Sequence, residues 1–338
     1  MSAPGPVVCF GEMLLRLSPP GAVPLAQAGT LKVDVGGAEA NVAAALASLG
    51  TPSQMVTALP DNPLGRKARA ALGAAGVDTR FIISDEGRIG LYFLEPPAGP
   101  RGGRVTYDRA GSVFALAAPD AFDFAGALAG ARLLHVSGIT PALGPGGCDL
   151  LRAAIRAARA ADVPVCFDGN YRANLWDAWD SDPRKVLAEL VGAAQILLGN
   201  HRDISLLLGR VFSGEGAERR REAAEAAFAA FPSLDLIAST ARQVVGGTHH
   251  RLAARVDTRE ESWQTEEIDV AGIVDRIGTG DAFAAGVLHR HLAGRSPREC
   301  AEAGLALAAL KHGVPGDMIL STERELEEFR PGGSDVRR

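Results

Sequence analysis

DRIGTGDAFAAG, residues Asp275–Gly286, places a glycine turn directly before an alanine-rich helix. Gly278-Thr279-Gly280 allows the backbone to turn tightly, and Asp281 then opens the helix. Consecutive backbone N–H groups at a helix N-terminus form a concavity that binds an anion such as phosphate. We therefore expect Gly278, Thr279 and Gly280 to form an anion hole, with Asp281 placed to accept a proton from an attacking hydroxyl.

Two better-known phosphate-binding motifs are excluded at this turn. A dinucleotide-binding fingerprint needs a glycine where Phe283 stands, and no GxxxxGK occurs anywhere for a Walker A loop. The glycine turn alone is a weak signal. The residues by themselves leave open that Asp281 only caps a helix.

The rest of the chain alternates short apolar runs with helical patterns, which is typical of a parallel sheet covered by helices on both faces. Such a sheet binds ligands outside the carboxyl ends of its strands. The predicted strands are Val7–Phe10, Met55–Leu59, Leu133–Ser137, Val163–Asp168, Ile196–Leu198 and Leu236–Ser239. The predicted helices include Ala38–Leu49, Gly65–Gly73, Leu150–Ala161 and Glu218–Phe231.

Two segments, about 13–36 and 87–113, interrupt this alternation. Both are strand-like and contain clustered proline and glycine, as in SPPGAVP and EPPAGPRGG. They could form a small antiparallel sheet beside the core, or they could be two long surface loops. We expect the core to span residues 1–328 and the glycine-containing tail, 329–338, to be flexible.

The composition is that of an ordinary globular protein of 338 residues, with 47% hydrophobic and 22% charged residues. The formal net charge of −5 gives no reason to expect nucleic-acid or membrane partners. The four cysteines lie far apart without zinc or redox spacing. No apolar stretch approaches the length of a membrane span and no signal peptide is evident, so we expect a cytoplasmic protein.

Two further groups of residues suit ligand binding. Gly36 and Gly37 precede a helix and would let a ligand approach the backbone closely, while Asn41 offers both a donor and an acceptor. Arginines also stand beside tyrosines, at Tyr107–Arg109 and Tyr171–Arg172, and a guanidinium can hold a carboxylate with two hydrogen bonds. Taken singly, these could be an ordinary loop-to-helix turn and surface arginines.

Taken together, these segments resemble the PfkB/ribokinase family of sugar kinases over about residues 7–325. The glycine pair with Asn41, DNPLG at 61–65, AGVDT at 75–79 and DRIGTGDAFAAG follow that family's order and spacing. The resemblance implies an α/β fold with a ribokinase-like, doubly wound, mostly parallel sheet and a small β-sheet lid. It also implies ATP and Mg²⁺ as cofactors, with Asp281 as the catalytic residue.

Within the family, the chain is most similar to the 2-keto-3-deoxygluconate kinases. LLHVSGITPAL at 133–143, the stretch 107–112 and DGNYRANLW at 168–176 carry this similarity. It implies a sugar-acid site lined by Gly36, Gly37, Asn41, Tyr92, Tyr107, Arg109, Ile139, Asn170 and Arg172. An aldonate carboxylate buried under a lid needs a paired cation, whereas a neutral sugar does not.

The nucleotide side departs from the family pattern. The resemblance implies nucleotide contacts at Asn200, Thr240, Arg242, Gly278 and Gly280, and a magnesium contact at Asp203 through water. The family usually has Asn-x-x-Glu where Asn200–Asp203 stands, and its glycine-rich nucleotide segment is replaced here by residues 239–247. Arg16 replaces an acidic residue that binds the sugar in ribokinase-like members, which argues against a pentose.

We therefore expect an ATP-dependent kinase that phosphorylates the terminal hydroxyl of 2-keto-3-deoxygluconate. Another specificity in the family, for fructose or a related keto-sugar acid, stays open because DxNxRxxLW is shared with fructokinase-like members. A sugar-acid sensor without catalysis also stays open because of the unusual segment 239–247. The resemblance further implies a homodimer through the lid, or a higher homo-oligomer.

Overall fold

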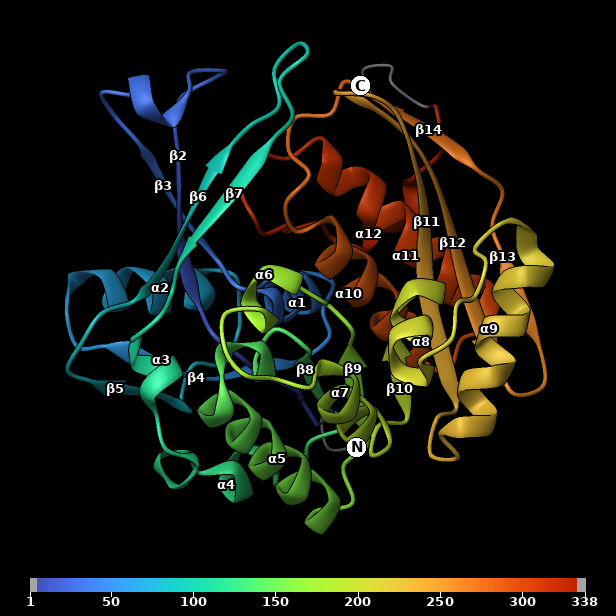
Figure 1. Ribbon diagram of the computed structural model, residues 1–338, viewed down its shortest axis with the longest axis horizontal. Coiled ribbons are helices and arrows are strands. Elements are labelled where there is room, and N and C mark those ends of the chain that lie inside the picture. The colour runs from blue at the N-terminus through green and yellow to red at the C-terminus, as the bar shows by residue number, and fades with distance from the viewer. Residues whose placement is uncertain (1–4, 333–338) are drawn as a thin grey trace.

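A computed structural model describes residues 5–332 of the chain. A ten-stranded sheet in the order β13-β12-β11-β10-β9-β8-β1-β4-β5, with β14 paired to β12, forms the centre of this part (Figure 1). The strands from β11 to β5 are parallel, and β12, β13 and β14 add an antiparallel edge. The bounds are β1 (Val7–Phe10), β4 (Ser53–Pro60), β5 (Ile82–Asp85), β8 (Leu133–Ser137), β9 (Val165–Asp168), β10 (Ile196–Leu198), β11 (Leu236–Gly246), β12 (His249–Thr258), β13 (Ser262–Gln264) and β14 (Ile268–Ala271).

Helices cover both faces of this sheet, and two hydrophobic clusters fill the space beneath them. Strand β1 shows how: Val7 and Cys9 pack in one cluster, and Val8 and Phe10 in the other, because successive side chains of a strand point to opposite faces. One face carries α1 (Ala38–Ser48), α2 (Pro63–Ala74), α10 (Thr279–Leu292), α11 (Pro297–His312) and α12 (Glu323–Glu328). The other carries α3 (Val113–Leu116), α4 (Phe124–Leu128), α5 (Pro145–Ala160), α6 (Ala173–Trp176), α7 (Pro183–Val191), α8 (His201–Leu208) and α9 (Gly216–Ala230).

A second sheet of four strands comes from the two irregular segments. Its order is β3-β2-β6-β7, with β2 (Leu14–Ser18), β3 (Lys32–Gly36), β6 (Gly90–Glu95) and β7 (Arg104–Asp108). The expectation of an antiparallel sheet was wrong for its centre, because β2 and β6 pair in parallel. Each belongs to its own hairpin, β2–β3 and β6–β7, and the two hairpins lie side by side in the same direction.

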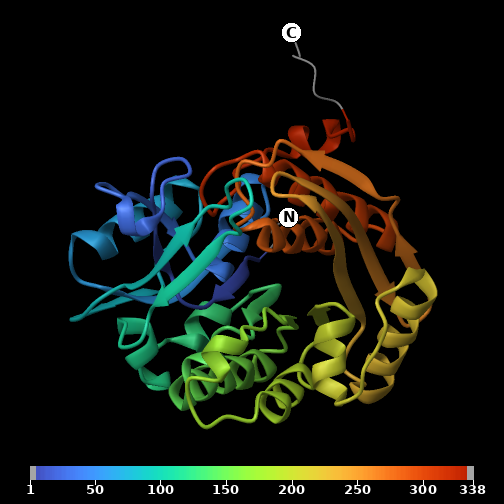
Figure 2. The ribbon, with the colours of Figure 1, turned by 45° about the horizontal axis from the view of Figure 1, so that its top comes forward.

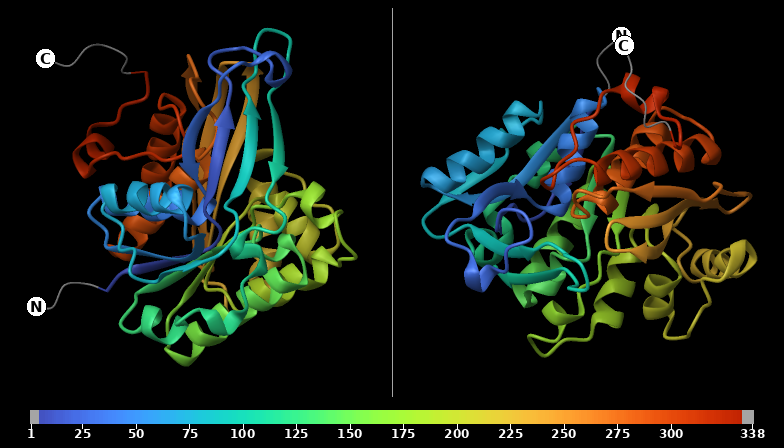
Figure 3. Two further views of the ribbon diagram at one scale, coloured as in Figure 1. Left: turned by 90° about the vertical axis from the view of Figure 1, so that its left-hand side faces the viewer. Right: turned by 90° about the horizontal axis from the view of Figure 1, so that it is seen from above.

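This second sheet and the β11–β12 hairpin project beyond the same edge of the main sheet (Figure 3). Figure 2 shows them on opposite sides of α10. The ribokinase-like α/β fold with a small additional sheet is therefore confirmed. None of the helices within residues 5–332 has the length and hydropathy that a bilayer crossing requires.

The longest difference from the predicted strands is β11, which continues to Gly246 rather than ending at Ser239. Residues 240–246 are mostly exposed and mix polar with apolar side chains, so they lack the apolar pattern of a buried strand. The antiparallel ladder with β12 holds them extended instead. Residues 333–338 of the predicted flexible tail lie outside the described range.

Candidate active site

The glycine turn Gly278–Gly280 leads into α10 as the sequence predicts. Gly278 is the N-cap residue with φ of 81°, a left-handed conformation that glycine adopts without strain, and its carbonyl accepts the first helical bond from Ala282 N at 2.9 Å. A Cβ at this position would lie 1.9 Å from the backbone oxygen of Asp317. Only glycine fits here, and the first N–H groups of α10 have no partner within the helix. The turn can therefore bind an anion.

Asp281, in the first turn of α10, lies against α1. Asn41 Nδ2 donates a hydrogen bond of 2.6 Å to Asp281 Oδ2, and Asn41 Oδ1 has no protein partner among the described residues. Burial raises the pKa of the Asp281 carboxyl to about 6, although the Asn41 bond and the nearby Arg172 act to lower this pKa. A carboxylate with a pKa closer to neutrality is a better proton acceptor than an ordinary aspartate.

Two more carboxylates follow the neighbouring strands β9 and β10. Asp168 ends β9, and burial together with the charges of Asp281 and Asp203 raises its pKa well above the usual range. Asp203 lies in the first turn of α8, where its Oδ2 accepts a 2.8 Å bond from Asn200 N in a capping box. Burial raises the pKa of Asp203 as well. Carboxyl groups are thus concentrated near the glycine turn, and a bound cation would favour their charged forms.

A Mg²⁺ ion fits this concentration of carboxyl groups. No three His, Cys, Asp or Glu side chains converge into a protein-only metal site within residues 5–332. Mg²⁺ usually keeps several waters and binds through one or two carboxylates together with substrate phosphates, so it does not need such a cluster. Asp203 and Asp168 are the residues suited to hold it.

Basic and polar residues surround these carboxylates in a cavity of about 530 Å³. Arg172 is exposed, donates to its neighbour's carbonyl, Tyr171 O, at 3.0 Å, and has no ion-pair partner among the described residues. Asn170 adopts a positive φ of 39°. The cavity is also lined by Asn200, Arg202, Asp203, Thr240, Arg242 and Gly280. Its free guanidinium groups can bind anionic ligands.

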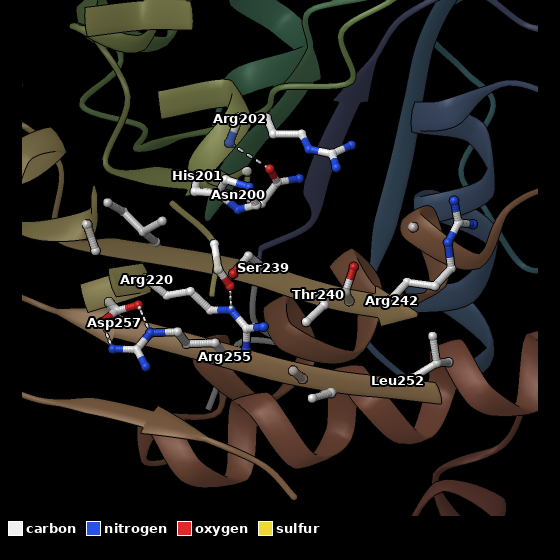
Figure 4. Close-up of a pocket in the computed structure, with 18 of the residues that line it drawn as sticks. Asn200, His201, Arg202, Arg220, Ser239, Thr240, Arg242, Leu252, Arg255 and Asp257 are labelled. Atoms are coloured by element: carbon white, nitrogen blue, oxygen red, sulfur yellow. Dashed lines mark hydrogen bonds and ion pairs between the residues drawn. The ribbon is translucent and has the colours of Figure 1, made fainter. Parts of the chain in front are cut away.

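A second cavity of about 720 Å³ opens from the same place and follows β11 and β12 away from the turn (Figure 4). Thr279 and Gly280 of the turn line it, together with Thr240 and Arg242 of β11. Figure 4 shows Asn200, His201 and Arg202 on the opposite side from the two strands. The two cavities share seven lining residues, namely Gly199, Asn200, Arg202, Ser239, Thr240, Arg242 and Gly280. They form one continuous elongated site.

Sequence reasoning missed the far end of this elongated site. Arg220 of α9 lines it and donates to Gly214 O at 2.8 Å, and Arg255 of β12 forms two bonds to Asp257 at 2.7 and 2.8 Å. Burial lowers the pKa of Arg220, as does the charge of Arg255. Only the fold brings α9 and β12 together, and no local motif marks either residue.

The second sheet lies on the other side of Asp281, and its polar residues are paired. Arg109, predicted to bind a carboxylate, is buried, and its Nε donates to Glu12 Oε2 at 2.7 Å. Its Nη1 has no hydrogen-bond partner within the described residues. Ser112 also donates to Glu12, at 2.5 Å. Arg109 therefore brings little uncompensated charge to this site.

Tyr92, Arg16 and Gly36 converge on one buried carboxylate, Asp317. The Tyr92 hydroxyl donates to Asp317 Oδ2, and a Cβ at Gly36 would lie 2.0 Å from the same oxygen. Arg16 of β2 forms ion pairs with Asp317 at 3.1 Å, Asp275 at 2.8 Å and Asp34 at 3.3 Å. The protein's own carboxylates neutralise the charge of Arg16. The sequence analysis did not predict these ion pairs.

The remaining predicted residues lie nearby on their own elements. Gly37 is the N-cap of α1 with φ of 139°, and Ile139 follows β8 and is nearly buried. Tyr107 lies on β7 with its ring centroid 6.3 Å from that of Tyr92. The predicted residues thus lie in two groups of elements: the second sheet with α1, and the segments on or directly after β8 to β11 together with the start of α10.

One buried carboxyl near Asp281 was not predicted. Glu39 of α1 is fully buried, and Ser137 Oγ donates to its Oε1 at 2.6 Å. Burial raises the pKa of Glu39 to about 7, with the Ser137 bond acting in the opposite direction. Its position within an apolar helical run was the available sequence signal.

The sequence profile of the pfkB family carbohydrate kinases matches residues 6–324. The chain is a pfkB family carbohydrate kinase. This membership supports ATP as one of its substrates.

Named relatives of this kinase cover almost its whole length. A 2-dehydro-3-deoxygalactonokinase from Haloferax volcanii is 34% identical, with 97% of each chain aligned. A 2-dehydro-3-deoxygluconokinase from Thermoproteus tenax is 28% identical, with 96% of this chain and 93% of the relative aligned. The crystal structure of a Thermotoga maritima 2-dehydro-3-deoxygluconokinase has a TM-score of 0.90 and 36% identity, covering 96% of this chain and 98% of that one.

Proposed function

We propose that this kinase transfers the γ-phosphoryl group of ATP to the terminal hydroxyl of 2-keto-3-deoxygluconate, also called 2-dehydro-3-deoxygluconate. The product is 2-keto-3-deoxy-6-phosphogluconate. The observation that carries the proposal is the Asp281 carboxylate, held by Asn41 at the mouth of the glycine turn between the two sides of the site. The names of the Thermotoga and Thermoproteus relatives support the choice of sugar acid.

Asp281 is the general base in this proposal. Its carboxylate accepts the proton of the sugar hydroxyl while that oxygen bonds to the γ-phosphorus and the bond to ADP breaks. The backbone N–H groups of the glycine turn stabilise the charge on the transferred group. Asn41 fixes the carboxylate through Nδ2 and offers its unpartnered Oδ1 to a sugar hydroxyl.

The elongated site would hold ATP along β11 and β12, with its phosphates between Asn200, Arg242 and the glycine turn. Mg²⁺, when bound by Asp203 through water, neutralises phosphate charge. Burial lowers the pKa of Arg242, as does the charge of the neighbouring Arg276. An anionic ligand relieves this repulsion between like charges.

The sugar acid would lie between the second sheet and the Asp281 side, under a lid formed by about 13–36 and 87–113. Gly36, Gly37, Asn41, Tyr92, Tyr107, Arg109, Ile139, Asn170 and Arg172 are its proposed contacts. Because Arg109 is already paired with Glu12, Arg172 is the better candidate for the substrate carboxylate. A lid that excludes water also limits ATP hydrolysis.

The experiment is ADP release with Mg·ATP and each of four sugars: 2-keto-3-deoxygluconate, 2-keto-3-deoxygalactonate, fructose and ribose. A kcat/KM at least tenfold higher for 2-keto-3-deoxygluconate supports the proposal. Preference for fructose keeps the mechanism and overturns the proposed acid pocket. Heat stabilisation by a sugar acid without ADP release favours a sensor.

2-Keto-3-deoxygalactonate is the second candidate substrate because the Haloferax volcanii relative is named for it. It differs from 2-keto-3-deoxygluconate only in configuration at C4, so the same carboxylate contact and the same terminal hydroxyl would serve. Comparison of the two epimers in one assay decides between them. A homodimer through the lid and a cytoplasmic location stay predictions, which light scattering and cell fractionation test.

A further inference from the structure

Lys311 is a fully buried lysine that the mechanism above does not use. It is the penultimate residue of α11, and its side chain has no exposed surface. The other three lysines of the chain have no such burial. Taking an ammonium group out of water is costly unless nearby groups compensate it. A buried lysine therefore needs a structural or chemical reason.

The Lys311 side chain packs directly beneath the glycine turn. A Cβ built on Gly278 would lie 3.3 Å from Lys311 Cε. The ammonium donates one hydrogen bond of 2.8 Å to the carbonyl of Val314, just beyond the end of α11. It forms no direct ion pair with a carboxylate among residues 5–332. No carboxylate among the described residues therefore neutralises the Lys311 ammonium by direct contact.

The charged groups around Lys311 explain why its charge stays available. Burial, the largest effect, lowers the pKa of Lys311 below its ordinary value, and the charge of Arg16 adds to this. Asp275, Asp317 and Asp281 act from a distance in the opposite direction. Asp275 and Asp317 form their direct ion pairs with Arg16 instead, at 2.8 and 3.1 Å. Asp275 also holds the segment before the turn, since its Oδ1 accepts from Ile277 N at 3.0 Å.

We propose that Lys311 is a positioning residue whose ammonium places a fixed positive charge beneath Gly278–Asp281, strengthening the anion hole and keeping Asp281 ionised. The inference rests on the proposed function, since it concerns the turn that receives the γ-phosphoryl group. Lys311 neither gains nor loses a proton in the transfer. Because the Lys311 ammonium supplies this positive charge, we expect the turn to bind its anion without an added monovalent cation.

The charge of Lys311 acts on Asp281 as this inference requires. Burial raises the pKa of Asp281, and the Asn41 hydrogen bond and the charges of Arg172 and Lys311 oppose that rise. Without the Lys311 charge, fewer groups oppose the effect of burial, so the pKa of Asp281 should rise further. The Asp281 carboxyl then stays protonated to higher pH and is a poorer acceptor at neutral pH.

The test compares Lys311→Met, which keeps the length of the side chain without its charge, with Lys67→Met, which changes an exposed lysine on α2. With whichever sugar the unmodified enzyme phosphorylates, we expect Lys311→Met to lower kcat about tenfold to hundredfold. KM for ATP should change less than threefold. The acidic limb of the kcat profile should move to higher pH, and methylammonium should restore part of the activity. A kcat and pH profile like those of Lys67→Met would overturn the inference.

Two measurements keep the test decisive if the variant folds poorly or the sugar is misassigned. The unmodified enzyme should have the same activity with Na⁺, K⁺ or choline as the only monovalent cation, and a strict need for K⁺ overturns the inference. The Asp281 carboxyl can be titrated by ¹³C NMR without turnover, with Asp281→Asn identifying its signal. Its pKa should be higher in Lys311→Met or Lys311→Gln than in the unmodified enzyme. An unchanged pKa overturns the inference whatever the substrate is.

Discussion

Asn41 Nδ2 lies 2.6 Å from Asp281 Oδ2, and this hydrogen bond joins α1, which follows the second sheet, to the glycine turn at the start of α10. A hydrogen bond to the ionised form of a carboxyl favours that form. The bond also fixes which Asp281 oxygen stays free for a proton. Asn41 thus connects the proposed sugar side of the site with the proposed phosphate side.

Asp281→Asn tests the base directly. The amide cannot accept the hydroxyl proton, so kcat should fall at least about a hundredfold, while KM for the sugar stays within about threefold. Steady-state ADP release measures both. Isothermal titration with the sugar acid is the control for retained binding. A variant with near-normal kcat would remove Asp281 from the proposed mechanism.

The same substitution should stabilise the fold at neutral pH. The folded-state pKa of Asp281, about 6, is higher than its ordinary value, so the folded protein binds this proton more tightly than the unfolded chain. The stability contributed by this proton is present at low pH and is lost as pH rises through about 6. Asp281→Asn removes that loss, and at pH 7.5 Tm should rise by about 2 °C. At pH 4.5 the difference from the unmodified protein should shrink.

The pH dependence of turnover follows from the same carboxyl. Because Asp281 must be ionised to accept a proton, kcat should decline about tenfold per pH unit below about 6. Asn41→Ala removes a hydrogen bond that lowers this pKa, so its acidic limb should lie at higher pH. Profiles of kcat from pH 5 to 9 measure the acidic limb of the unmodified enzyme and that of Asn41→Ala. An identical limb in the two proteins would show that another group controls it.

Arg16 provides a test of how the second sheet is fixed to the core. Its ion pairs with Asp275 and Asp317 are buried, so Arg16→Met leaves two uncompensated carboxylates and should cost about 3–5 kcal/mol in the free energy of unfolding. Urea unfolding measures this. Arg152→Met, which breaks the exposed pair with Glu189, is the matched control and should cost about 1 kcal/mol or less. Equal losses would mean that the Arg16 pairs hold little of the structure together.

The sequence predicted those parts of the fold whose local pattern decides the structure. Strands β1, β8 and β10 match their predicted bounds because each is a short apolar run buried on both faces. The glycine turn and α10 were predicted because the turn needs a residue that tolerates positive φ. The parallel pairing of β2 with β6 was not, because two separate hairpins must meet before it exists.

The pairing of charges in the site was beyond sequence reasoning for a related reason. Arg109 was predicted to be free for a substrate, but Glu12 lies 97 positions earlier in the chain and pairs with it only in the folded state. Arg16 likewise meets carboxylates from the other end of the chain. Residue type and spacing predict which side chains can bind an anion. They do not predict which of them the protein neutralises itself.

Arg172 provides a test of whether an arginine without an ion-pair partner binds the substrate carboxylate. It is exposed at the carboxyl end of β9 and has no carboxylate partner among the described residues, whereas Arg109 is paired. Since a hydrogen bond to a charged group contributes about 1.5–3 kcal/mol, Arg172→Leu should raise KM for a sugar acid by about 10–100-fold.

The matched comparison for Arg172→Leu is the same variant with fructose, which has no carboxylate, if the enzyme phosphorylates it measurably. Its KM for fructose should change less than threefold, and KM for ATP should stay similar. Arg172 also lines the cavity that contains Asp203 and Gly280, so it could bind phosphate instead. Equal loss with both sugars, together with a higher KM for ATP, would assign Arg172 to the nucleotide and leave Arg109 Nη1 as the remaining cationic contact for the acid.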